Sequence, residues 1–186
     1  MSEPIFTVAN QLTLLRMALA PLLVVLVLVR AHTWAVVVFI LAGVTDLLDG
    51  FIARHGSQQT TLGAMLDPVA DKVLLASTYV ALTWGPALAC PIPVWLTVIV
   101  LSRDAIIVLS VTIVNLTLGR RVFHPSLLGK LCTVFQLTSA GLALLGSAMG
   151  ECPPGVVWLF GATLVITVSS ALHYVYRASA RPPEAR

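Results

Sequence analysis

Long apolar stretches separated by short polar segments dominate the pattern of this 186-residue chain. A bilayer core of about 30 Å is crossed by about 20 residues of helix, and six stretches of roughly that length contain few charged residues. Because backbone polar groups in lipid must pair within their own segment, each stretch is predicted to be an α-helix. The predicted spans are residues 10–29, 33–53, 65–84, 92–118, 127–149 and 156–176.

The composition agrees with this interpretation. Hydrophobic residues make up 58% of the chain and charged residues only 10%, whereas a soluble domain is about a quarter charged. One small core cannot bury so much apolar surface, which excludes ordinary soluble, disordered and fibrous proteins. A net charge of +3 is too small to indicate a nucleic-acid partner. We expect an all-α integral membrane protein, a bundle of six transmembrane helices, with one domain at residues 1–176 and a flexible basic tail at 177–186.

Positive charges fall mostly on one side of the predicted bundle. Six spans put both termini on one side, together with Arg54, Arg120, Arg121 and Lys130, whereas the opposite side has only Arg30. Cytoplasmic segments carry the excess of Lys and Arg, so both termini are expected in the cytoplasm. The N-terminal segment lacks secretory and transit-peptide features, so the first span is expected to be an uncleaved anchor. A bacterial inner membrane is the default location and a mitochondrial inner membrane the alternative.

The three cysteines match no metal-binding spacing. Cys90 and Cys152 both fall in segments on the predicted far side, opposite the cytoplasm. They could form a disulfide if that compartment is oxidising, but sequence alone does not provide the geometry that would decide it.

Four of the eight acidic residues lie within 26 positions. Asp46 and Asp49 are spaced i, i+3 and Asp67 and Asp71 are spaced i, i+4, so each pair occupies one face of its helix. Both pairs lie near the predicted cytoplasmic helix ends, which a short connection holds close together. Four converging carboxylates repel one another and are costly at membrane depth, so they need compensating charge. Divalent ions that prefer oxygen ligands, such as Mg²⁺, Mn²⁺ or Ca²⁺, would supply it.

The residues around the aspartates distinguish this hypothesis from a simpler one, in which the carboxylates reach water or pair with Arg54 and Lys72. Gly50 and Gly63 lower helix stability but would let a ligand approach the backbone. Arg54 offers a forked donor for phosphate oxygens, and Thr60 a hydroxyl in the same segment. Carboxylates for metal, glycines for access and an arginine for an anion indicate phosphoryl transfer.

In order, these positions spell DxxDGxxAR(x8)GxxxDxxxD, which resembles the signature of the CDP-alcohol phosphatidyltransferases, integral membrane enzymes of phospholipid synthesis. The residues that carry the match are Asp46, Asp49, Gly50, Ala53, Arg54, Gly63, Asp67 and Asp71. The resemblance extends from ANQLTLLR near the N-terminus to HPSLLGKLCTVFQL near residue 130. It therefore covers most of the chain.

The resemblance implies a divalent-metal site with two ions, Mg²⁺ or Mn²⁺. Asp46, Asp49, Asp67 and Asp71 would hold them, with Asp71 also taking the proton of the acceptor hydroxyl. The active site would lie at the cytoplasmic ends of the second and third helices. In the family reaction an alcohol attacks the lipid-side phosphorus of CDP-diacylglycerol and CMP leaves. Residues implied to line the CDP pocket are Asp49, Gly50, Arg54, Thr60 and Gly63.

Two subfamilies differ in the acceptor alcohol. Cardiolipin synthases use phosphatidylglycerol, and phosphatidylglycerophosphate synthases use glycerol 3-phosphate. The segment IPVWLTVIVLSRDAIIV and the later HPSLLGKLCTVFQL resemble the first group more closely. Arg16, Arg103 and Lys130 are candidate cations for the acceptor or lipid phosphate, and they suit either substrate. Two simpler interpretations stay open: Arg16 could extend to the headgroups, and Arg103 could pair with Asp104.

Other classes fit the pattern less well. A small ion or proton carrier would spread its acids through the membrane depth, often in two related halves, but the aspartates gather at one interface and no repeat is visible. A structural membrane protein gives no reason for glycines and an arginine at fixed positions among them. The family resemblance also implies a homodimer, and Gly141 and Gly146 could let helices or subunits pack closely.

Overall fold

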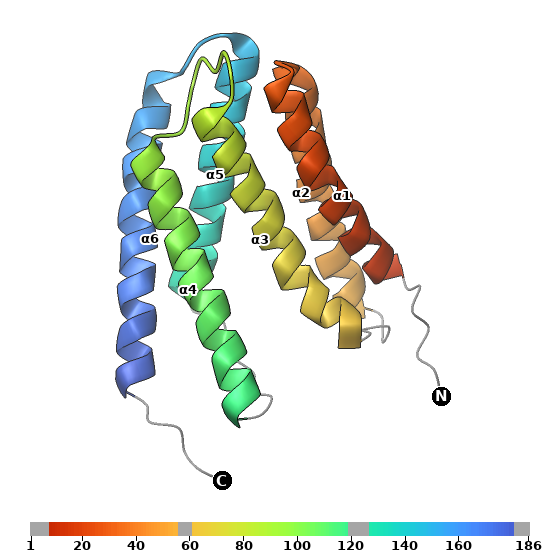
Figure 1. Ribbon diagram of the computed structural model, residues 1–186, viewed down its shortest axis with the longest axis vertical. Coiled ribbons are helices and arrows are strands. Elements are labelled where there is room, and N and C mark those ends of the chain that lie inside the picture. The colour runs from red at the N-terminus through yellow and green to blue at the C-terminus, as the bar shows by residue number, and fades with distance from the viewer. Residues whose placement is uncertain (1–7, 56–60, 119–126, 181–186) are drawn as a thin grey trace. The chain divides into compact units, whose positions relative to one another are not determined.

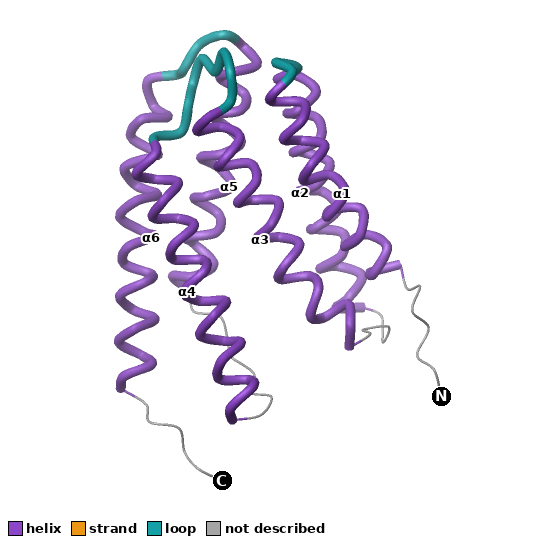
Figure 2. The backbone as a smooth tube through the Cα atoms, in the orientation of Figure 1, coloured by secondary structure: helices purple, strands orange, loops and turns teal. Residues whose placement is uncertain are grey.

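The computed structural model describes the backbone of residues 8–55, 61–118 and 127–180, and the side chains of residues 11, 14–46, 72–109 and 127–174. All regular structure in these ranges is helical (Figures 1 and 2). The helices are α1 (Val8–Leu28), α2 (His32–His55), α3 (Thr61–Trp84), α4 (Val94–Leu118), α5 (Leu127–Met149) and α6 (Pro154–Ala180). The predicted all-α class is confirmed, and each predicted span overlaps one of these helices.

The ends of α1 and α5 show why the predicted helix boundaries lie close to the observed ones. Arg30 and Gly150 follow α1 and α5 with φ values of 61° and 82°, in the left-handed region that ends helices. The next amide donates five residues back in both cases, from Ala31 to Leu26 O at 2.8 Å and from Glu151 to Gly146 O at 3.1 Å. Gly150 has no Cβ to oppose this conformation, so α5 ends at the predicted residue.

The chain divides into two compact units. One comprises residues 1–91 and 140–152 and contains α1, α2, α3 and the C-terminal part of α5. Within it α1 packs against both α2 and α3. Ala20 of α1, Ala42 of α2 and Leu74 of α3 form a buried cluster, in which the small alanines allow close helix packing. Gly141 of α5 also packs closely within this unit, because a Cβ there would lie 3.3 Å from Phe39 of α2.

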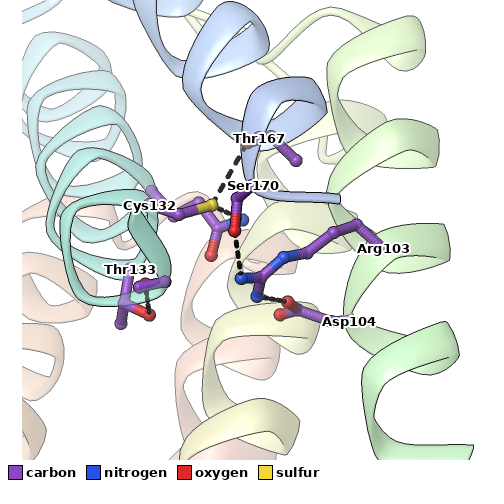
Figure 3. Close-up of polar contacts among 8 residues, drawn as sticks. Arg103, Asp104, Cys132, Thr133, Thr167 and Ser170 are labelled. Carbon is purple, nitrogen blue, oxygen red and sulfur yellow. Dashed lines mark hydrogen bonds and ion pairs between the residues drawn. The ribbon is translucent and has the colours of Figure 1, made fainter. Parts of the chain in front are cut away.

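The other unit comprises residues 92–139 and 153–186, in which α4 packs against α6. Hydrogen bonds between side chains join its helices. Ser139 Oγ of α5 lies 2.6 Å from Thr163 Oγ1 of α6, and Cys132 Sγ lies 3.5 Å from Thr167 Oγ1 (Figure 3). These contacts fix how α5 and α6 are aligned along their lengths.

A disulfide joins Cys90, between α3 and α4, to Cys152, between α5 and α6. The amide of Cys90 also donates to Ser147 Oγ at 3.3 Å, so the segment is held by a second bond. The pairing that the sequence left open is therefore present. Cys132 is a buried free thiol.

Many large apolar side chains are exposed, although most of the buried side chains are apolar as well. Large apolar residues such as Val25, Ile40 and Val165 are exposed, whereas Gln136 and Thr163 are buried. Within the described residues, two stretches are long and apolar enough to cross a membrane, Leu127–Met149 and Pro154–Tyr174; Leu14–Leu28 and His32–Asp46 are apolar but shorter. These features fit a membrane protein.

Candidate active site

The two aspartate pairs lie on neighbouring elements of one unit. Asp46 and Asp49 are in the C-terminal half of α2, and Asp67 and Asp71 are in the N-terminal half of α3. Only residues 56–60 separate the two helices, and both helices pack against α1. The backbone thus places both pairs on the helix ends nearest their connection. Of the four side chains, only that of Asp46 is among those described.

Asp46 forms an ion pair with Arg16 of α1. Arg16 Nη1 lies 3.2 Å from Asp46 Oδ1, and the exposed fractions of the two side chains are 2% and 48%. The Arg16 side chain is therefore buried in the helix packing. The carboxylate that it contacts keeps about half of its surface open to a ligand.

The apolar cluster explains why these two side chains meet. Arg16 precedes Ala20 by four residues, Asp46 follows Ala42 by four, and position 71 precedes Leu74 by three. In a helix these intervals correspond to about one turn on the same face. Since α1 and α2 run in opposite directions through the cluster, the next turn brings Arg16 beside Asp46. The backbone of position 71 lies one turn from the same cluster.

The predicted CDP-pocket residues are placed at the level of the backbone. Asp49, Gly50 and Arg54 lie in the last turns of α2, and Gly63 lies in the first turn of α3. Thr60 lies outside the described residues. Both glycines are therefore helical, and no turn requires them; a close approach of ligand to the helix surface remains the physical reason for a missing side chain.

Among the candidate acceptor cations, Arg103 is held within the protein. Its Nη1 donates to Asp104 Oδ1 at 2.7 Å and its Nη2 to Ser170 Oγ at 2.8 Å (Figure 3). The side chains of Arg103 and Asp104 are 8% and 11% exposed. The predicted local pairing of Arg103 with Asp104 is confirmed. Lys130, on α5, is exposed.

Sequence reasoning missed the contact between Arg16 and Asp46 and the polar seam between α5 and α6. A signal for the seam was present, because Cys132, Gln136 and Ser139 recur at i, i+4 and i+7 within an apolar helix. Thr163, Thr167 and Ser170 repeat that spacing on α6, so residues of similar polarity face each other. For the contact of Arg16 with Asp46, the sequence offered one signal: the two residues fall at a similar depth in consecutive predicted spans.

Metal ligation rests on residues only partly described. No group of three or more His, Cys, Asp or Glu side chains able to hold a metal occurs among the described side chains, which do not include those of Asp49, Asp67 and Asp71. The donor chemistry of the four positions is uniform, since all are carboxylates. Such a set fits a hard divalent cation such as Mg²⁺ or Mn²⁺.

Residues 6–173 match the family model of the CDP-alcohol phosphatidyltransferases. The chain belongs to this family. The family predicted from the aspartate signature is therefore confirmed, and the match covers α1 to α5 and most of α6.

Named relatives of this phosphatidyltransferase family member fall into the two predicted subfamilies. A human cardiolipin synthase (CMP-forming) is 34% identical, over 92% of this chain and 61% of the human protein. A cardiolipin synthase (CMP-forming) of Streptomyces coelicolor is 35% identical over 80% of this chain and 70% of its own length. A probable phosphatidylglycerophosphate synthase of Mycobacterium tuberculosis is 34% identical over 94% and 82%. The chain thus spans about three fifths of the human protein that it matches.

Proposed function

We propose that this phosphatidyltransferase moves the phosphatidyl group of CDP-diacylglycerol to phosphatidylglycerol, which yields cardiolipin and CMP. The observation that carries the proposal is the complete aspartate signature on α2 and α3, within a chain that matches the family over residues 6–173. Relatives named cardiolipin synthase (CMP-forming) support phosphatidylglycerol as the acceptor.

We propose that Asp46, Asp49, Asp67 and Asp71 hold two divalent ions, Mg²⁺ or Mn²⁺. The half-exposed carboxylate of Asp46 supports this assignment, because about half of its surface stays accessible to a ligand although it contacts Arg16. When bound, the ions would neutralise the diphosphate and stabilise the departing CMP.

The remaining roles belong to this chain's own side chains. Asp71 accepts the proton of the acceptor hydroxyl while that oxygen forms a bond to the lipid-side phosphorus. The bond from this phosphorus to the bridging oxygen breaks, and CMP leaves with the electron pair. Arg54 donates to phosphate oxygens, and Thr60 adds a hydroxyl. Asp49, Gly50 and Gly63 complete the proposed CDP pocket, the glycines by letting the nucleotide approach the helices.

For the acceptor phosphate we propose Lys130, which is exposed; the other two candidates, Arg103 and Arg16, are each buried and held in an ion pair. A second acceptor, glycerol 3-phosphate, has its own support in the relative from Mycobacterium tuberculosis. A dianionic acceptor would need more of these cations than phosphatidylglycerol does.

We propose six membrane spans, with both termini and the active site, at the ends of α2 and α3, in the cytoplasm. The excess of Lys and Arg on that side supports this orientation. The disulfide supports it independently, because Cys90 and Cys152 lie in segments on the predicted far side and disulfides persist in oxidising compartments. The proposed location is a bacterial inner membrane, or a mitochondrial inner membrane, and the proposed assembly is a homodimer.

The experiment supplies the purified full chain in liposomes with CDP-diacylglycerol and Mg²⁺ or Mn²⁺, and tests acceptors singly. CMP release and the lipid product are measured for phosphatidylglycerol, glycerol 3-phosphate, inositol phosphate and serine. Cardiolipin from phosphatidylglycerol is the expected product. Consumption of glycerol 3-phosphate without any cardiolipin would instead establish the second acceptor. For variants that remove the charge of one of the four aspartates, the matched control is Glu151→Gln, which removes an exposed charge between α5 and α6.

A further inference from the structure

Arg16 is one of the most deeply buried large side chains of the described residues, with 2% of its side chain exposed. A buried guanidinium is costly unless an anion and hydrogen bonds compensate it. Asp46 Oδ1, at 3.2 Å from Nη1, provides the anion. The contact joins α1 to α2, so it differs from a pair formed by neighbours on one helix.

Because of the position of α1, this contact can affect all four aspartates and not Asp46 alone. α1 packs against both helices that carry the aspartates. The cluster of Ala20, Ala42 and Leu74, about one turn from Arg16 and Asp46, holds the three helices together. An arginine at this point on α1 therefore brings a permanent positive charge to the helix ends where four carboxylates are located. Repulsion among carboxylates is greatest when no metal is present.

We propose that Arg16 is a positioning residue for the metal site, a built-in counter-charge that orients Asp46 and keeps the carboxylate cluster folded before metal binds. The proposal rests on the proposed metal role of Asp46. It assigns Arg16 to the cluster and not to the acceptor phosphate, since a side chain 2% exposed would have to break its ion pair to reach a substrate.

The sign of the effect follows from charge. Arg16 lowers the repulsion in the metal-free state but also repels an incoming divalent cation. Replacing it with an uncharged residue should therefore destabilise the metal-free protein and, at the same time, increase the affinity of the cluster for metal. An arginine that served only as a packing element would stabilise both states equally.

The test compares the full-length wild type with Arg16→Gln and Arg16→Lys in detergent, without substrates. The melting temperature is measured in EDTA and in saturating Mg²⁺, and Mn²⁺ binding is measured by electron paramagnetic resonance. Arg16→Gln should show a clearly larger rise in melting temperature with Mg²⁺ than the wild type, and Mn²⁺ binding several-fold tighter. Arg16→Lys, which keeps the charge, should restore most of the wild-type behaviour.

Arg103→Gln is the matched control, because it removes another buried arginine whose anion, Asp104, lies outside the proposed metal cluster. It should lower the melting temperature equally in EDTA and in Mg²⁺. Equal losses for Arg16→Gln, or an Arg16→Gln protein that does not fold even in saturating Mg²⁺, would overturn the positioning role. If the wild type itself bound no Mn²⁺, the proposed metal site would be wrong and not merely the role of Arg16.

Discussion

Two buried arginines of this protein each face an aspartate, but the two pairs are built differently. Arg16 and Asp46 come from different helices, and the Asp46 side chain is 48% exposed. Arg103 and Asp104 are adjacent on α4 and are both almost fully buried, and Arg103 also donates a hydrogen bond to Ser170 of α6. The second pair is closed to ligands and fastens two helices, whereas the first leaves its carboxylate accessible. The ligand role that we propose for Asp46 therefore rests on the exposure of its carboxylate, which Asp104 lacks, since both arginines are buried.

The largest expected effect is a loss of activity that distinguishes the aspartates proposed to bind metal from Asp104. Asp67→Asn should lower CMP release by about 10³-fold or more with every acceptor, because losing a metal ligand costs several kcal/mol of transition-state stabilisation. Asp104→Asn, assayed on folded protein, should lower it by less than about tenfold. Rates are measured from CMP release in liposomes. Near-normal turnover by Asp67→Asn would refute the metal assignment.

Breaking the closed pair should affect stability. Arg103→Met leaves Asp104 buried beside an apolar chain, and removing one partner of a buried ion pair costs about 3–5 kcal/mol. The free energy of unfolding in mixed micelles is the measurement. Adding Asp104→Leu to Arg103→Met should recover most of the loss, because neither position of the pair then carries a charge. A single variant as stable as the wild type would mean that the pair contributes nothing.

A smaller loss is expected from the hydrogen bond between Arg103 and Ser170. Ser170→Ala should cost about 1.5 kcal/mol, since this bond has a charged donor. Ser169→Ala, an exposed neighbour on the same helix, is the control and should change the free energy of unfolding little. Equal effects of the two changes would contradict a structural role for the contact with α6.

The smallest effect concerns neutral contacts between α5 and α6. Thr163→Val removes the hydroxyl that lies 2.6 Å from Ser139 Oγ and keeps the side-chain shape. Hydrogen bonds between membrane helices contribute about 0.6 kcal/mol on average, so a loss of that size is expected. Thr138→Val, which removes an exposed hydroxyl bonded to its own helix, serves as the control in the same unfolding assay. A loss approaching that of Arg103→Met would mean that the polar seam between α5 and α6 stabilises this unit as strongly as the buried ion pair does.

The length of the apolar stretches predicted the helices well because each helix is determined locally. α5 has the predicted bounds, and its end follows from Gly150 alone. α3 begins at Thr61, four residues before its predicted start, and within that extra turn Thr61 and Gly63 are not apolar, which made the stretch look shorter than the helix. The aspartate signature identified the family through spacing within one stretch of sequence.

Contacts between distant segments could not be obtained in the same way. The partner of Arg16 depends on which faces of α1 and α2 meet, which the cluster of Ala20 and Ala42 decides and a single sequence does not reveal. The bond between Cys90 and Cys152 likewise depends on the approach of two segments 62 residues apart. Arg103 and Asp104 were foreseeable as a pair because they are neighbours in the chain.

The Cys90–Cys152 bond also changes the connectivity of the molecule. It closes a covalent ring that includes all of α4 and α5. A protease cut anywhere within that ring would leave the two fragments attached, and the nicked protein would run as one band until a reductant was added. The stretch between α4 and α5 is therefore a place where the backbone can be opened without releasing either half of the polypeptide.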